Sequence, residues 1–169
     1  MSADLDDADA AADAFWAFSL AVYAKPGVKE ACLAFQEQGG DVNTGLFAAW
    51  VARLGRDPSA VISKAGALGR DWSGAVVKPL RAARDALKPA PDYVDAQAGA
   101  ALRKQILSAE LEAERLQQRA LAPLEVSCPV STEPPGALAA AALERWAGEA
   151  GLGYDARAFV EIVFSAAET

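Results

Sequence analysis

One short polar turn has residue types that could hold a ligand. Residues 39–43 read Gly-Gly-Asp-Val-Asn, which places a carboxylate, Asp41, and an amide, Asn43, at a predicted helix start. The free backbone N–H groups of such a start favour an anionic or polar ligand. The same short side chains are also the usual N-caps, which accept hydrogen bonds from those N–H groups. The turn therefore predicts either a ligand site or a helix cap at Asp41 and Asn43.

The middle of the chain is basic, although the chain as a whole is acidic. Residues 53–88 hold eight Lys or Arg against three Asp, in a chain with a formal net charge of −7. Residues from 78 to 88 repeat basic side chains at helical spacing and can share a face. We expect either a solvated helix surface or an anion site for a phosphate, an acidic partner or the acidic N-terminal segment. The candidate ligand or partner contacts are Arg53, Lys78, Arg81, Arg84 and Lys88.

Several kinds of chemistry are excluded by what the sequence lacks. The chain has no His, which excludes the usual Ser–His–Asp and Cys–His catalysis and imidazole metal ligands. Glu110, Glu112 and Glu114 lack the His partners of a bundle di-iron site, so we expect them on a solvated helix face. The sequence holds no phosphate-binding glycine loop and no nucleophile elbow. We predict no catalytic residue, metal or cofactor, and nucleic acid is disfavoured because its phosphates repel an acidic chain.

The cysteines and most aromatic residues are expected to be structural. Cys32 lies on the apolar side of a predicted helix, where a thiol acts as a small hydrophobe. Cys128 stands beside Pro129 in a predicted loop and is expected to be more accessible, with no obvious base nearby. An aromatic cluster is expected in the core, with a pocket lining as the alternative. Its members are Phe15, Trp16, Phe18, Tyr23, Phe35, Phe47 and Trp50.

Composition indicates one folded domain. The 169 residues are 53% hydrophobic and 23% charged, with a mean hydropathy of +0.10, which is too apolar for a disordered chain. The first residues lack the basic start of a secretory signal. The longest apolar stretch, residues 14–24, is too short to span a bilayer, and two cysteines make no disulfide framework. We therefore expect a cytoplasmic protein.

The apolar periodicity predicts an all-α protein, a single compact bundle of about seven helices without a sheet. An acidic disordered tail at residues 1–10 precedes a single helical domain at residues 11–169. A Pro-rich loop is expected at residues 123–135, and Pro79 predicts a break or kink near residues 77–78. The predicted helical segments are residues 11–24, 28–38, 43–54, 57–68, 71–88, 92–120, 135–150 and a last helix after Asp155.

The longest predicted helix carries an apolar stripe with alternating spacings of four and three residues. A heptad-like stripe of this kind favours a long antiparallel or coiled-coil contact, with a partner inside or outside the chain. Its members are Leu102, Ile106, Ala109, Ala113, Leu116 and Ala120.

Residues 15–55 also carry a fixed order of uncommon residues. These are Phe15, Trp16, Phe18, Ser19, Leu20, Tyr23, Pro26, Gly27, Val28, Ala31, Cys32, Leu33, Gln36, Asp41, Val42, Asn43 and Trp50. This order resembles the N-terminal motif of an uncharacterised proteobacterial family of small helical proteins, a domain of unknown function. The likeness continues loosely through Trp72, Leu80, Arg81 and Lys88. The resemblance implies a cytoplasmic, helical, bacterial protein without an assigned activity, and it supplies no catalytic residues.

Two functions follow as hypotheses. The first is a non-catalytic protein-interaction or regulatory module that binds a protein partner, or a second copy, through the stripe at residues 102–120. The alternative is a protein or enzyme that binds a small anionic metabolite with Asp41, Asn43 and the basic segment 53–88. The alternative requires Asp41, Asn43 and the arginines to converge on one cleft.

Overall fold

Helices account for the secondary structure of the described chain. The computed structural model describes residues 2–167, and the side chains of residues 7–165. Two 3-10 segments, η1 (Pro58–Ala60) and η3 (Ala122–Ser127), and a π-helical turn, η2 (Ser73–Val77), lie between the α-helices. The α-helices are α1 (Ser2–Tyr23), α2 (Val28–Glu37), α3 (Val42–Arg53), α4 (Ile62–Trp72), α5 (Lys78–Asp85), α6 (Ala96–Leu121), α7 (Pro135–Ala150) and α8 (Ala156–Ala167).

The predicted all-α fold of about seven helices is confirmed. Because α4, η2 and α5 follow one another without a break, the eight α-helices of residues 2–167 form seven rods. Within the same residues there is no sheet, and the one extended pairing is an isolated β-bridge between Arg56 and Val130. None of the described helices is both long and apolar enough to cross a bilayer.

Several helix ends follow the turn residues that predicted them. The Asp41 carboxylate accepts a hydrogen bond from the backbone N–H of Thr44 at 2.8 Å, which caps α3. Gly151 follows α7 in the left-handed conformation, with φ of 66°, and lets Leu152 N donate to Ala147 O at 2.9 Å. Helix α7 has the predicted bounds. These helix ends depend only on residues within the same turn, so they can be predicted from the sequence.

Helix α1 begins earlier than the sequence predicts. It starts at Ser2, so residues 2–10 are helical where we expected a disordered acidic tail; Met1 lies outside the described residues. Aspartates near a helix N-terminus interact favourably with the helix dipole. Arg119 of α6 also pairs with Asp9 at 2.5 Å and Arg115 with Asp13 at 3.7 Å. The acidic segment therefore has cationic partners that lie about a hundred residues away in the sequence.

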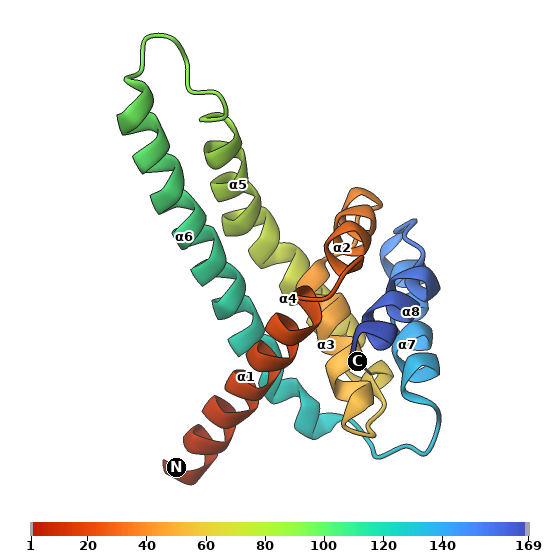
Figure 1. Ribbon diagram of the computed structural model, residues 1–169. Coiled ribbons are helices and arrows are strands. Elements are labelled where there is room, and N and C mark those ends of the chain that lie inside the picture. Colours follow the sequence, from red (N-terminus) through yellow and green to blue (C-terminus); the bar gives the residue numbers. More distant parts are fainter. Residues whose placement is uncertain (1, 168–169) are drawn as a thin grey trace.

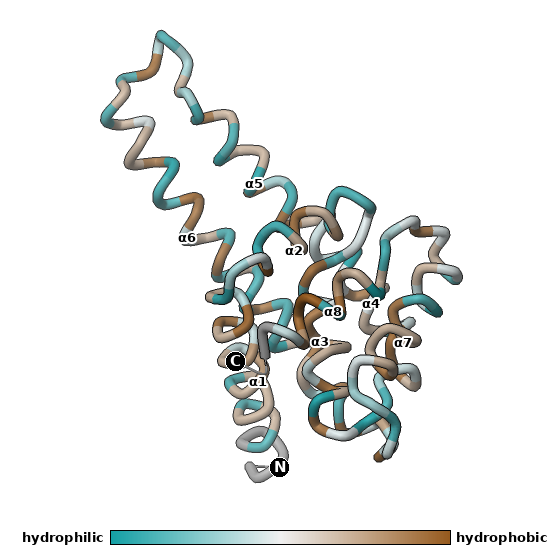
Figure 2. Tube along the Cα trace, turned by 45° about the vertical axis from the view of Figure 1, so that its right-hand side comes forward, coloured by the Kyte–Doolittle hydropathy of each residue, from teal (hydrophilic) through white to brown (hydrophobic). Residues whose placement is uncertain are grey.

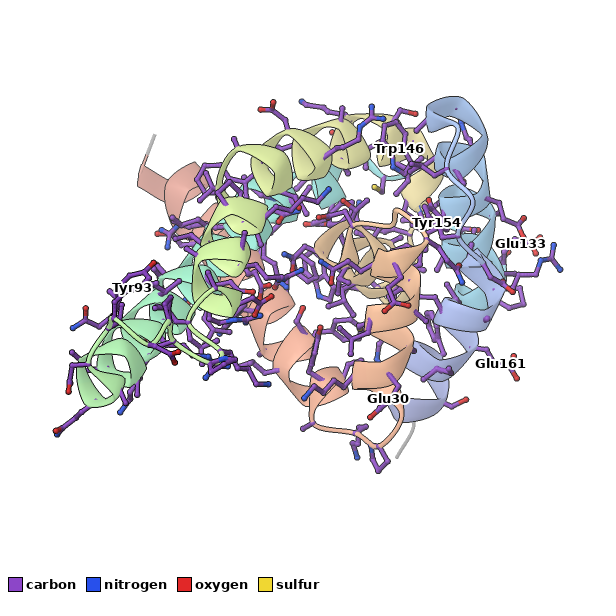
Figure 3. The ribbon with its side chains drawn as sticks, turned by 90° about the horizontal axis from the view of Figure 1, so that it is seen from above. Glu30, Tyr93, Glu133, Trp146, Tyr154 and Glu161 are labelled. Carbon is purple, nitrogen blue, oxygen red and sulfur yellow. The ribbon has the colours of Figure 1, made fainter. Side chains whose placement is uncertain are left out.

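Pro79 bends its helix without ending it. The proline has no N–H to donate to the carbonyl of Ala75, so a regular α-helix would lose a hydrogen bond there. The wider π-helical turn η2 lies directly before it and absorbs this irregularity. Seen from above, the rod changes direction between the yellow α4 and the lime α5 (Figure 3). The predicted kink is present, and the predicted break is not.

The core is centred on α3. Every residue of α3 from Asn43 to Ala52 is buried, and the helix packs against α1, α2, α4, α6, α7 and α8. Phe15 stacks on Trp50 with ring centroids 5.0 Å apart, and Phe35 stacks on Phe159 at 4.3 Å. The predicted aromatic core is confirmed for Phe15, Phe35, Phe47 and Trp50, whereas Tyr23 is 44% exposed. We call α1–α4, α7 and α8 the body.

Helices α5 and α6 form a long hairpin that projects from the body (Figure 1). We call residues 78–121 the hairpin. No residue of α5 is fully buried, and its contacts are mainly with α6 and η2. Tyr93, in the turn between the two helices, is 90% exposed and lies far from Trp146 of the body (Figure 3). The hairpin is an arm of mixed hydropathy (Figure 2).

The apolar stripe predicted on α6 does not face the rest of the chain. Leu102, Ala109, Leu116 and Ala120 are exposed, and of the predicted stripe only Ala113 is buried. A polar line of α6 is covered instead: α5 contacts Glu110, and α1 and α3 of the body contact Gln117 and Gln118. Of the two alternatives given for this stripe, a partner inside or outside the chain, the structure does not show the inside one for most of its residues.

Candidate functional site

The strongest concentration of polar side chains lies where α6 meets α1, α3 and α5. We call this set the polar layer. One part joins amide and hydroxyl groups near the C-terminal end of α6. The other part joins arginines of α5 to two glutamates that lie one and two turns closer to the N-terminal end of α6. Its members are Ser19, Asp41, Asn43, Thr44, Arg81, Arg84, Glu110, Glu114, Gln117 and Gln118.

The amides of the polar layer satisfy one another. Gln118 Nε2 donates to Asn43 Oδ1 at 2.7 Å, and Asn43 Nδ2 donates to Gln117 Oε1 at 3.0 Å. Ser19 Oγ donates to Gln118 Oε1 at 3.1 Å. All four side chains are buried, where an amide left without partners would cost free energy. These bonds fix α1 and α3 against α6.

Asp41 links the helix cap to the same chain of bonds. Its Oδ1 accepts hydrogen bonds from Thr44 N at 2.8 Å, Thr44 Oγ1 at 2.7 Å and Gln117 Nε2 at 2.8 Å. Gly69 of α4 lies against this group, since a Cβ there would stand 2.7 Å from Asp41 Oδ1 and 2.5 Å from Thr44 Oγ1. Asp41 and Asn43 therefore have protein partners within the polar layer.

Two arginines of α5 share the carboxylates of α6. Arg81 Nε donates to Glu110 Oε1 at 2.8 Å, and Arg81 Nη2 contacts Glu114 Oε1 at 3.2 Å. Arg84 Nη1 lies 2.7 Å from Glu110 Oε2, and Arg84 also pairs with Asp85. The Glu110 side chain is only 4% exposed, so our prediction that it lies on a solvated face is wrong. Its burial is offset by two guanidinium groups from a neighbouring helix.

Glu114 lies between like and opposite charges. Burial raises the pKa of its carboxyl above the usual value, and the nearby Glu110 and Asp41 act in the same direction. Arg81 and Arg84 oppose this shift. The Glu114 carboxyl therefore keeps its proton to a higher pH than a free glutamate does.

The cysteines are not placed as nucleophiles. Burial raises the pKa of the Cys32 thiol to about 11, although the neighbouring Tyr23 hydroxyl lowers it. Burial likewise raises the pKa of Cys128 to about 11, and its thiol faces Leu124 O. Cys128 is buried because η3 folds over it, so our expectation of an accessible Cys128 is wrong. A thiol with a raised pKa and little exposure is a poor nucleophile.

The remaining predicted basic residues do not join the polar layer. Arg53 is exposed at the end of α3, and Lys78 and Lys88 are exposed at the two ends of α5 and its following turn. The structure thus brings Asp41, Asn43, Arg81 and Arg84 to one helix, α6, but it joins them through α6 side chains and not across an open cleft. The described residues contain no group of three or more His, Cys, Asp or Glu placed to hold a metal ion.

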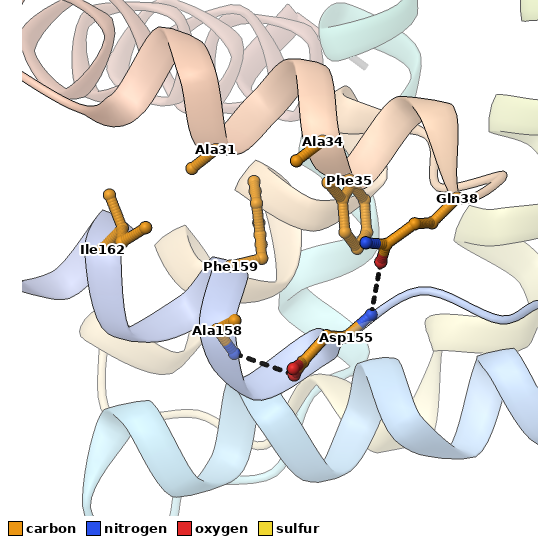
Figure 4. A pocket seen from close by; sticks show the side chains of 8 residues that line it. All are labelled: Ala31, Ala34, Phe35, Gln38, Asp155, Ala158, Phe159 and Ile162. Atoms are coloured by element: carbon orange, nitrogen blue, oxygen red, sulfur yellow. Dashed lines mark hydrogen bonds between the residues drawn. The ribbon is translucent and has the colours of Figure 1, made fainter.

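Two pockets lie away from the polar layer. A small one of about 90 Å³ between α2 and α8 is lined mainly by apolar side chains such as Phe35, Phe159 and Ile162 (Figure 4). At its rim Asp155 N donates to Gln38 Oε1 at 2.8 Å (Figure 4). A larger one of about 390 Å³ lies at the hairpin turn, beside Pro89, Pro91 and Arg103. None of the candidate ligand or partner contacts named from the sequence lines either pocket, whereas Phe35 of the aromatic cluster is buried in the core and also lines the smaller pocket.

Ser19, Thr44, Gln117 and Gln118 are the members of the polar layer that sequence reasoning missed as site residues. A signal for them exists on α6, because Glu110, Glu114, Gln117 and Gln118 recur at helical spacing within a helix otherwise rich in Ala and Leu. Polar residues at that spacing usually mark a solvated face, so the pattern alone does not reveal burial. The hydrogen-bond partners of Gln117 and Gln118 on α1 and α3 lie 74 to 99 residues away in the sequence.

The fold and the polar layer define an all-α protein with a projecting helical hairpin. The chain belongs to the family described as "Protein of unknown function (DUF2390)", whose family model matches residues 14–121. That match ends with α6, so it includes the polar layer and the hairpin but not α7 and α8. Neither a curated protein nor a solved structure matches the chain.

Proposed function

We propose that this protein is a non-catalytic interaction module that binds another protein through the hairpin. One observation carries the proposal: four leucines of α6 are left partly open to solvent, although a helix of this length normally buries its apolar side chains. Leu102, Leu107, Leu111 and Leu116 are 49, 36, 49 and 47% exposed. Exposed apolar groups gathered on one projecting element are typical of a protein-binding surface.

The polar layer supports this proposal by keeping the hairpin in place. The amide bonds from Gln117 and Gln118 and the ion pairs of Glu110 hold the inner face of the hairpin. The leucines are then presented on the outer flanks of a helix whose position is fixed before binding, which lowers the ordering cost of association. We propose a cytoplasmic location, in line with the two cysteines, which are free and form no disulfide framework.

Binding of an anionic metabolite receives less support. Arg81 and Arg84 each lie within ion-pair distance of a glutamate, so an added anion would compete with carboxylates already in place. Asp41 and Asn43 are similarly occupied by Thr44, Gln117 and Gln118.

A capture experiment with paired variants tests the proposed function. The wild-type chain is immobilised and exposed to a bacterial lysate, next to Leu102→Gln/Leu116→Gln and Leu107→Gln/Leu111→Gln. Leu33→Gln serves as the matched control, because Leu33 is 51% exposed but lies on α2 of the body. We expect proteins that bind the wild type and the control but not one or both hairpin variants. The same set of proteins on all four baits would contradict the proposal.

A further inference from the structure

Five exposed alanine and leucine residues along one flank of α6 are spaced symmetrically about the central one, Ala109. Around Ala109, a leucine stands seven residues away on each side, Leu102 and Leu116, and an alanine stands eleven residues away on each side, Ala98 and Ala120. All five are exposed. We call them the Ala–Leu stripe. Steps of seven and four residues keep them on one side of an α-helix.

We propose that the Ala–Leu stripe binds the same stripe of a second copy of this chain, with the two α6 helices antiparallel and a two-fold axis at Ala109. This inference rests on the proposed function and names the partner. In a two-fold interface each surface must complement itself. An antiparallel pair centred on Ala109 sets Leu102 against Leu116 of the second copy, and Ala98 against its Ala120. The central alanine allows the two helices to approach closely.

The residues beside the stripe fit the same register. Gln105 and Glu112 lie on one side of it, four residues before and three residues after Ala109, and both are exposed. A two-fold axis keeps this side of one helix next to the same side of the other. Gln105 then lies beside Glu112 of the second copy, where its amide can donate a hydrogen bond to the carboxylate. The two copies of Glu112 are then separated along the helix axis by about six residues, or about 9 Å.

The shape of the molecule leaves room for this pairing. The body packs on the C-terminal part of α6, through Ser19, Asn43 and Asp41, while the N-terminal part reaches the projecting tip (Figure 1). In an antiparallel pair each body lies at the tip of the other hairpin, so the two bodies do not collide. The contact between residues 98 and 120 would be about 33 Å long and about 10 Å wide, well below the roughly 800 Å² per partner of a standard interface and in the range of weak complexes. We therefore expect a dimer that dissociates on dilution.

Single cysteines placed along the stripe test the register in the full chain. In the proposed dimer residue 109 of one chain faces residue 109 of the other chain. Ala109→Cys is therefore expected to form a disulfide-linked dimer under mild oxidation. Residue 98 lies about 33 Å from its own copy in this arrangement, so Ala98→Cys should remain monomeric on a non-reducing gel. The double variant Ala98→Cys/Ala120→Cys should again crosslink. The wild-type chain gives the background, since Cys32 and Cys128 are buried.

Two results would overturn the inference. Crosslinking of Ala98→Cys as strong as that of Ala109→Cys would indicate a parallel or unordered contact. No crosslinking of Ala109→Cys above the wild-type background, at concentrations up to about a millimolar, would exclude the pairing at affinities usual for weak complexes.

Sedimentation velocity separates this inference from the proposed function. We expect the wild type and Leu33→Gln to show the same concentration-dependent dimer, and Leu102→Gln/Leu116→Gln to weaken it at least about tenfold. A wild-type chain that stays monomeric throughout overturns the second copy as partner, while the lysate capture still decides whether the hairpin binds a different protein. Leucine variants that alter neither self-association nor capture overturn both.

Discussion

In the body, α3 buries Leu46, Phe47 and Val51, whereas in the hairpin α6 buries Glu110 and Gln117 and leaves its leucines partly exposed. The two helices belong to the same chain and touch through Asn43. In the body, apolar side chains are removed from water and supply the free energy of folding. In the hairpin, hydrogen bonds and ion pairs hold the inner face, and apolar area remains available outside.

This difference assigns stability to the body and, in our proposal, binding to the hairpin. Buried hydrogen bonds add little net stability, but an incorrect arrangement would leave polar groups without partners and would be costly. The polar layer therefore favours one position of the hairpin over others. The close packing around α3 supports that position, for example where the ring of Phe159 lies in the place that a side chain at Gly45 would occupy.

The largest effect is expected from a cavity in the body. Phe47 is fully buried and lies beside Phe15 and Trp50, so Phe47→Ala should lower the free energy of unfolding by about 3–5 kcal/mol. Urea denaturation measures the loss, and Leu54→Ala, at an exposed position just after α3, provides the comparison. A loss below about 1 kcal/mol would mean that the body is not the main source of stability.

A smaller loss is expected in the polar layer. Gln117→Ala removes the acceptor for Asn43 Nδ2 and a donor to Asp41, and we expect a loss of about 1–3 kcal/mol. Gln97→Ala, at an exposed position of the same helix outside the Ala–Leu stripe, should change the free energy of unfolding by less than about 0.5 kcal/mol. Equal effects of the two substitutions would show that the amide bonds do not matter to folding.

A still smaller effect should appear in the dependence of stability on pH. The raised pKa of Glu114 means that the folded state favours its protonated form. Its contribution is thus fully present below the unfolded-state pKa near 4.5 and is lost as the pH rises through the folded-state value. Glu114→Gln keeps a neutral side chain, so between about pH 4 and about pH 7 it should lose less stability than the wild type does. Glu161→Gln, at an exposed position of α8, is the control, and parallel curves for Glu114→Gln and the wild type would contradict the burial of the Glu114 carboxyl.

The sequence predicted the helices well where local patterns decide. Val28, Ala31, Cys32 and Phe35 follow helical spacing, and all four are buried on α2. A cap was one of the two alternatives predicted at Asp41, and it is the one observed, because an N-cap needs only its own turn. The start of α1 was missed because its aspartates pair with arginines of α6, which no local pattern reveals.

The inner face of α6 could not be predicted for the same reason. Two lines of residues run along this helix, one apolar through Leu102 and Leu116 and one polar through Glu110 and Gln117. Burying the apolar line is the usual outcome, and the spacing predicts it. The polar line is buried because Ser19, Asn43 and Arg81 bring matching groups from three other helices. Only the tertiary arrangement supplies those partners.

The central claim is that the outward leucines of α6 serve binding and not folding. Its most direct test is the free energy of unfolding of Leu102→Gln/Leu116→Gln, measured by urea denaturation at a dilution where the wild type is monomeric. The account predicts a value within about 1 kcal/mol of the wild type, because surface substitutions away from structural features change stability little. A loss of about 3 kcal/mol or more, as large as that expected for Phe47→Ala, would place these leucines in the folding core and contradict the account.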